Sequence, residues 1–121
     1  MSQQGLETIE STTQKIHEWI ARIAEALHME KRDAYKSLRA VLQTLRDRLP
    51  VDLAVHFGAQ LPMLIRGAYY EHWEPSGKPS PLRSREEFFS GLAGSLSRDG
   101  ENTASAETVT RAVFRLLDSH R

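Results

Sequence analysis

The sequence predicts an all-α domain, and three observations support this fold class. Apolar residues recur at spacings of three and four along most of the chain, which is the period of an amphipathic helix. Proline, glycine and serine gather in short breaks between these segments, and no segment shows sustained strand alternation. The length of 121 residues fits one domain. We therefore expect a compact bundle of about six helices.

The first two helices are predicted over residues 12–27 and 31–48. Ser11 and Gln14 have the spacing of a capping box, so Ser11 is expected to be the N-cap of the first helix. Residues 1–11 are then a flexible N-terminal segment. Each helix carries one apolar stripe, and Pro50 stops the second one.

A short third helix is predicted over residues 51–59, and a fourth from Pro62 to about residue 72, since proline suits a first helical turn. On a helical wheel the fourth helix has two apolar sides. One side carries Leu61, Leu64, Ile65, Ala68 and His72, and the other carries Met63, Arg66, Tyr70 and Trp73. We expect a buried central helix, in which Gly67 permits the close approach of a neighbour.

The remaining chain predicts two more helices. A loop with three prolines covers residues 74–83, and Ser84 with Glu87 has the spacing of a second capping box. A helix follows this box, and after another polar loop the last helix is expected over about residues 104–119.

Two pairs of short matches indicate an internal repeat. The pattern Trp19-x3-Ile23-x3-Leu27 matches Phe88-x3-Leu92-x3-Leu96, and "RAVLQTL" at 39–45 matches "RAVFRLL" at 111–117. We therefore expect a single helical domain over residues 12–121, in which 12–73 is a four-helix repeat. Residues 84–121 form a partial second repeat, a helical hairpin that repeats the first two helices and lacks the last two.

Two segments carry a resemblance to a known family. The chain resembles the bacterial domain of unknown function family 2267 over about residues 12–121, most specifically in "LRAVLQTLRDRLP" and "GAQLPMLIRGAYYEHW". The resemblance implies a helical fold. It also implies a further C-terminal helix past the position of Arg121, which this chain lacks. No activity, cofactor or catalytic residue comes with the resemblance.

Composition excludes several classes of function. The chain has no cysteine, so disulfides and metal–thiolate sites are excluded. We find no phosphate-binding loop, nucleophile elbow, HExxH or helical pair of histidines four residues apart. We therefore expect a protein that is not an enzyme and binds no metal or cofactor. No secretory signal and no membrane span are visible, which leads us to expect a cytoplasmic protein without membrane contact.

The expected role is protein interaction or self-association, with a homo-oligomer or another protein as partner. The candidate interaction face consists of Met63, Arg66, Tyr70 and Trp73, because such residues are enriched in interface cores. One alternative is a nucleic-acid-associated protein that uses a basic face of the second helix, made of Arg32, Lys36, Arg39 and Arg46. The net charge of zero argues against nucleic acid. A further alternative is a small-ligand or haem-type pocket between helices.

Overall fold

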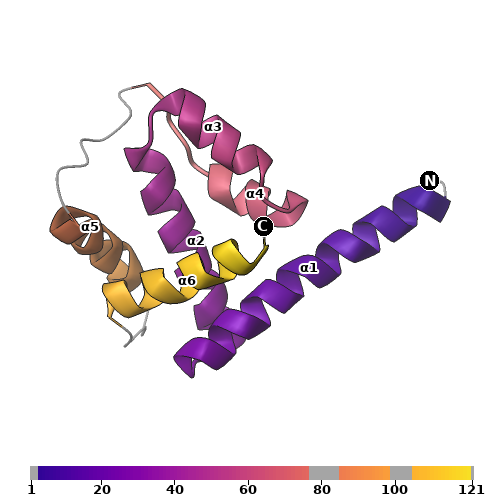
Figure 1. Cartoon of the computed structure of the whole chain (residues 1–121), viewed down its shortest axis with the longest axis horizontal. Helices are drawn as coiled ribbons and strands as arrows, with labels where there is room; N and C mark the ends of the chain where they lie inside the picture. Colours follow the sequence, from indigo (N-terminus) through magenta and orange to yellow (C-terminus); the bar gives the residue numbers. More distant parts are fainter. Residues whose placement is uncertain (1–2, 77–84, 99–104, 121) are drawn as a thin grey trace.

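The computed structural model describes residues 3–76, 85–98 and 105–120, which form six helices (Figure 1). They are α1 (Gln3–Leu27), α2 (Lys31–Arg48), α3 (Val51–Ala59), α4 (Met63–Tyr70), α5 (Arg85–Arg98) and α6 (Ala106–His120). No strand occurs in these three ranges, and the predicted all-α fold is confirmed. No helix within them is long and apolar enough to span a membrane.

The central helix of the bundle is α2. It packs against α1, α4, α5 and α6, and it runs through the middle of the fold in Figure 1. Its side chains Leu38, Val41 and Leu42 are almost completely buried. The expectation that the helix after Pro62 is central is therefore wrong. That helix, α4, lies to one side of α2, where it also packs against α1 and α3.

The two pairs of helices matched in sequence pack crosswise. The first helix, α1, lies against α6, while α2 lies against α5. Matched apolar residues are buried on both α1 and α5, namely Trp19 and Ile23 on α1 and Phe88 and Leu92 on α5. This crosswise packing is compatible with two related helical hairpins, and the repeat itself stays a prediction.

The first helix starts earlier than the sequence predicted. It begins at Gln3, so the predicted start at residue 12 and the N-cap role of Ser11 are wrong. The hydroxyls of Thr8, Thr12 and Thr13 donate to carbonyls four residues earlier, at 3.0, 2.8 and 3.0 Å, and so are satisfied within the helix. Residues 3–14, which we call the arm, project away from the other helices in Figure 1.

The helix boundaries that involve proline follow the sequence closely. Both α2 and α3 have the predicted ranges, with Pro50 between them, and Pro62 is the N-cap of α4. The last helix is capped by Ser105, whose Oγ accepts a hydrogen bond from the Thr108 amide at 3.2 Å. The predicted capping box at Ser84 lies outside the described residues.

Candidate interaction surface

Arg66, one of the four residues of the predicted interaction face, is engaged in capping a helix. Its Nε donates to the carbonyl oxygen of Gly58 at 3.0 Å, and its Nη2 donates to those of Ala59 and Leu61 at 3.2 and 2.9 Å. The carbonyls of Gly58 and Ala59 lie at the C-terminal end of α3, where the last carbonyls of a helix have no amide partner within it, and that of Leu61 lies in the following turn. Arg66 therefore holds the turn between α3 and α4.

Tyr70 and Trp73 also face inward. The Tyr70 hydroxyl donates to the carbonyl oxygen of Val55 at 3.3 Å, and its ring centroid lies 5.0 Å from that of Tyr69 and 5.5 Å from that of Trp73. Both Tyr70 and Trp73 are half-buried. Met63, by contrast, is 58% exposed. The four side chains of the predicted face therefore do not gather on one exposed surface.

A different glycine from the predicted one permits close helix packing. Gly67 is exposed, and among the described residues no atom beyond its chain neighbours and its own helix backbone lies within 4 Å of the position that a Cβ would take. The predicted role of Gly67 is thus wrong. At Gly58, on α3, a Cβ would lie only 2.7 Å from Cζ of Tyr70 and 2.9 Å from Cε2 of Tyr69. Gly58 therefore lets the two tyrosines pack α4 against α3.

The predicted basic face of α2 is not formed as a set of four. Arg32 is exposed, while Lys36 and Arg39 are half-buried, and the guanidinium of Arg39 lies 5.6 Å from the ring centroid of Tyr35. Arg46 is only 4% exposed. A buried guanidinium cannot contact a phosphate backbone, so the inclusion of Arg46 in this face was wrong.

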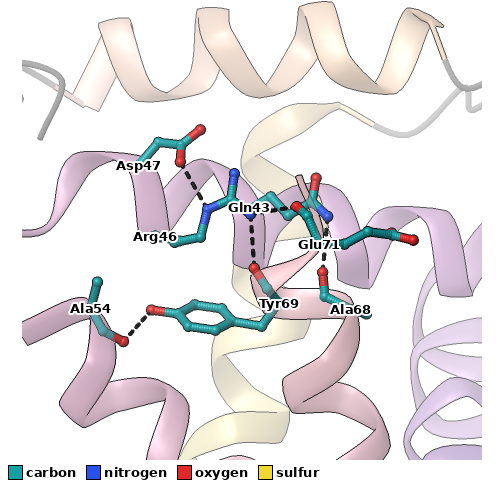
Figure 2. A network of polar contacts seen from close by, with 7 residues as sticks. All are labelled: Gln43, Arg46, Asp47, Ala54, Ala68, Tyr69 and Glu71. Carbon is teal, nitrogen blue, oxygen red and sulfur yellow. Dashed lines mark hydrogen bonds and ion pairs between the residues drawn. The ribbon is translucent and has the colours of Figure 1, made fainter. Parts of the chain in front are cut away.

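Arg46 instead ties α2 to the end of α4, as Figure 2 shows. Its Nη1 donates to the carbonyl oxygens of Tyr69 and Glu71 at 2.9 and 2.8 Å, and its Nε pairs with Asp47 at 2.8 Å. One turn earlier on α2, Gln43 donates to the carbonyl oxygen of Ala68 at 2.9 Å. The end of α4 is thus anchored by side chains that lie more than twenty residues earlier in the chain.

Tyr69 completes this buried polar network. Its side chain is fully buried, and its hydroxyl donates to the carbonyl oxygen of Ala54 at 2.6 Å (Figure 2). Burial raises the pKa of the Tyr69 hydroxyl from 10.0 to about 12, and the neighbouring Tyr70 adds to this rise. Tyr69 therefore stays a neutral donor that links α4 to α3.

An apolar groove opens between α1, α3 and α6, and we call it the α1–α3–α6 groove. Its volume is about 710 Å³. The described residues that line it are mostly apolar: Trp19, Phe57, Gln60, Leu61, Phe114, Leu117 and Asp118. Phe114 is 42% exposed, although Leu42, its counterpart in the predicted repeat, is fully buried. The groove therefore leaves a large aromatic side chain partly in water.

A second exposed apolar feature is found on the arm. Leu6 and Ile9 are 47% and 50% exposed. Further along the same helix, Trp19 and Ile23 are almost completely buried. The arm was not predicted, because residues 1–11 were expected to be a flexible segment. The apolar spacing of Leu6 and Ile9 with Ile16 and Ile20 was the available signal.

No metal centre is formed by the described parts of the chain, in which no group of three or more His, Asp or Glu side chains has a suitable arrangement.

The chain was compared with known protein families and with curated proteins. A family model described as an uncharacterized conserved protein (DUF2267) matches residues 16–121. A search of curated proteins found no match. The arm, residues 3–14, precedes the matched residues.

Proposed function

The chain belongs to the DUF2267 family, and we propose that this member is a non-enzymatic interaction module that associates with a second copy of itself through the arm of α1. The observation that carries the proposal is the half-exposure of Leu6 and Ile9 on a helix that projects beyond the bundle (Figure 1). The proposal keeps the cytoplasmic location expected from the sequence. It moves the interaction surface away from Met63, Arg66, Tyr70 and Trp73.

The apolar stripe of α1 continues from the bundle into the arm without a change of face. At 100° per residue, its members lie within a stripe about 100° wide. They are Leu6, Ile9, Ile16, Ile20, Ile23 and Leu27. With Thr13 included, the spacings alternate strictly between three and four residues, which is the pattern of a helix that packs along another helix. The second half of this stripe packs within the bundle, and the first half is exposed and can pack against a partner.

The α1–α3–α6 groove lies at the base of the arm. Trp19 of α1 lines the groove, and it follows the arm by little more than one helical turn. A two-fold axis across two α1 helices brings the arm of each copy toward the groove of the other. One copy therefore offers the two kinds of apolar surface that a reciprocal dimer requires.

Charge favours an antiparallel arrangement of the two α1 helices. The arm carries Glu7 and Glu10 and no basic residue, whereas the next eight residues include Lys15 and Arg22 and only one carboxylate, Glu18. In an antiparallel pair the acidic half of one helix lies beside the basic half of the other. A parallel pair would bring the two acidic arms together.

Contact between the two arms alone does not provide enough free energy for a stable dimer, so each arm must also cover the groove of the other copy. Burial of the exposed halves of Leu6 and Ile9 contributes roughly 1 kcal/mol for each side chain, or about 4 kcal/mol for two arms. Association costs an estimated 4–15 kcal/mol in lost translational and rotational freedom, which equals or exceeds the gain from burial of the two arms. The proposed dimer therefore requires burial of Phe114 in addition to the two arm residues.

The oligomeric state tests the proposal. We expect a dimer in sedimentation equilibrium, and we expect a variant with Leu6→Gln and Ile9→Gln to sediment as a monomer that still unfolds cooperatively, because the arm contributes little to the bundle. Phe114→Gln should also weaken the dimer. The matched control is Met63→Gln, since Met63 is at least as exposed as these residues but lies on α4.

Two results would reject this role. The first is a wild-type protein that stays monomeric at its highest soluble concentration. The second is a dimer that persists in the arm variant but dissociates in the Met63 variant, which would return the interaction surface to α4.

The nucleic-acid alternative loses its main support. It depended on four basic residues of α2, and Arg46 is buried.

A further inference from the structure

A second pocket lies between α1 and α6, on a different side of α6 from the groove. Its volume is about 290 Å³, and its described lining shares no residue with the α1–α3–α6 groove. Three arginines line it: Arg22 on α1, and Arg111 and Arg115 on α6. None of the described lining residues is acidic.

The three guanidinium groups differ in how far they are neutralised. Arg111 forms an exposed ion pair with Glu107 on the same helix, at 2.7 Å. Arg22 donates to the neutral hydroxyl of Ser119 at 2.9 Å. Arg115 has no hydrogen bond or ion pair within residues 3–76, 85–98 and 105–120. The pocket therefore keeps an excess of positive charge, and three like charges around one pocket favour the binding of an anion.

The floor of the pocket is apolar. Ile23 and Leu116 line it and are almost completely buried, and Leu27 and Ala112 add further apolar surface. A hydrated inorganic ion leaves such a floor unused. Pockets of this kind, with apolar walls and a few convergent polar groups, typically take small organic ligands.

We propose that this pocket binds a small amphipathic carboxylate, with its ring or short chain on the apolar floor and its carboxylate against Arg22 and Arg115. A guanidinium donates two parallel hydrogen bonds to a carboxylate, which selects a planar anionic group over a neutral one. Thr108 also lines the pocket, and its hydroxyl accepts a hydrogen bond from Ser105 at 2.8 Å. This site is independent of the proposed self-association.

A matched pair of probes tests both parts of the proposal. The binding of 2-naphthoate is compared with that of 2-naphthamide, which keeps the rings and lacks the charge, by titration monitored through backbone amide chemical shifts. We expect 2-naphthoate to bind at least about tenfold more tightly, because hydrogen bonds to charged groups are the stronger ones. The shifted amides should cluster in residues 22–27 and 108–116. Acetate should bind far more weakly than 2-naphthoate, since it lacks the ring.

Variants distinguish binding of 2-naphthoate in this pocket from nonspecific binding elsewhere on the surface. Arg22→Gln and Arg115→Gln should each reduce the affinity for 2-naphthoate about tenfold, while Arg32→Gln, an exposed arginine of α2, should leave it unchanged. The arm variant with Leu6→Gln and Ile9→Gln should also retain binding, which keeps this test separate from that of the dimer. Equal binding of the acid and the amide would overturn the proposal. So would shifts centred on Phe57 and Phe114, or affinity unchanged by Arg22→Gln and Arg115→Gln.

Discussion

The guanidinium of Arg46 on α2 donates a hydrogen bond to the carbonyl oxygen of Tyr69 at 2.9 Å, near the C-terminal end of α4. Arg66 makes the equivalent contact for α3, through the carbonyl oxygen of Gly58 at 3.0 Å. The C-terminal end of a helix carries a partial negative charge and unsatisfied carbonyls, so a cation stabilises it. Two arginines therefore fix the C-terminal ends of the two short helices, α3 and α4.

Removal of the Arg46 guanidinium should destabilise the fold strongly. In Arg46→Met the buried carbonyl of Tyr69 and the partly buried carbonyl of Glu71 lose their charged donor, and we expect the free energy of unfolding to fall by about 2–4 kcal/mol. Urea denaturation measures this loss. The control is Arg32→Met on the exposed side of α2, which should change stability by less than about 0.5 kcal/mol. Equal effects of the two substitutions would contradict the capping role of Arg46.

The two glycines of α3 and α4 should respond oppositely to alanine. Gly58→Ala places a methyl group against the rings of Tyr69 and Tyr70 and should cost about 1–3 kcal/mol. Gly67→Ala places its methyl group in open space on the exposed side of α4 and should stabilise the protein by up to about 1 kcal/mol. Thermal denaturation of both variants measures the difference. A loss of stability at Gly67 together with tolerance at Gly58 would reverse the assignment.

The sequence predicted α2 and α3 to the residue because their boundaries depend on local signals, chiefly Pro50 and the apolar periodicity of each segment. Arg46 shows why the candidate site was less predictable. Its position in a basic stripe is visible in the sequence, but its partners are backbone carbonyls of Tyr69 and Glu71, which any residue type provides. Burial of a charge against backbone depends on tertiary packing, which helical periodicity does not specify.

The two apolar sides of α4 show a related limit. The helical wheel separates Ile65 from Tyr70 correctly, and both are at least half-buried. It does not reveal that α4 packs against α1, α2 and α3, rather than between two halves of a bundle. The same limit applies to Gly58 and Gly67, because only the packed structure shows which glycine has a neighbour.

Stability should decline at alkaline pH as the buried Tyr69 hydroxyl is forced to ionise. Its pKa is raised to about 12 in the folded protein, against 10.0 for an ordinary tyrosine. The folded state therefore binds this proton more tightly, so its contribution is complete below pH 10 and is lost as the pH rises toward 12. We expect denaturation midpoints to fall across this range in the wild type and to fall less in Tyr69→Phe. Equal pH dependence in both proteins would exclude Tyr69 as the cause.

A histidine in a left-handed conformation offers a stabilising substitution. His28 follows α1 with φ at 53°, and the next amide, of Met29, donates to the carbonyl oxygen of Ala24 at 3.0 Å. This is the helix-ending motif in which glycine is preferred. His28→Gly should raise the free energy of unfolding by about 1 kcal/mol. His17→Gly, inside α1, should lower it by about 1 kcal/mol, and a gain from both would contradict the assignment.

A distance between two spin labels tests the proposed dimer most directly. The chain has no cysteine, so Ser11→Cys provides a single labelling site on the arm, opposite its apolar stripe. Pulsed dipolar spectroscopy should give one narrow distance distribution between the labels of two copies. The signal should disappear when Leu6→Gln and Ile9→Gln are added. The absence of any dipolar coupling in the otherwise unaltered labelled protein, at concentrations where it is soluble, would contradict self-association through the arm.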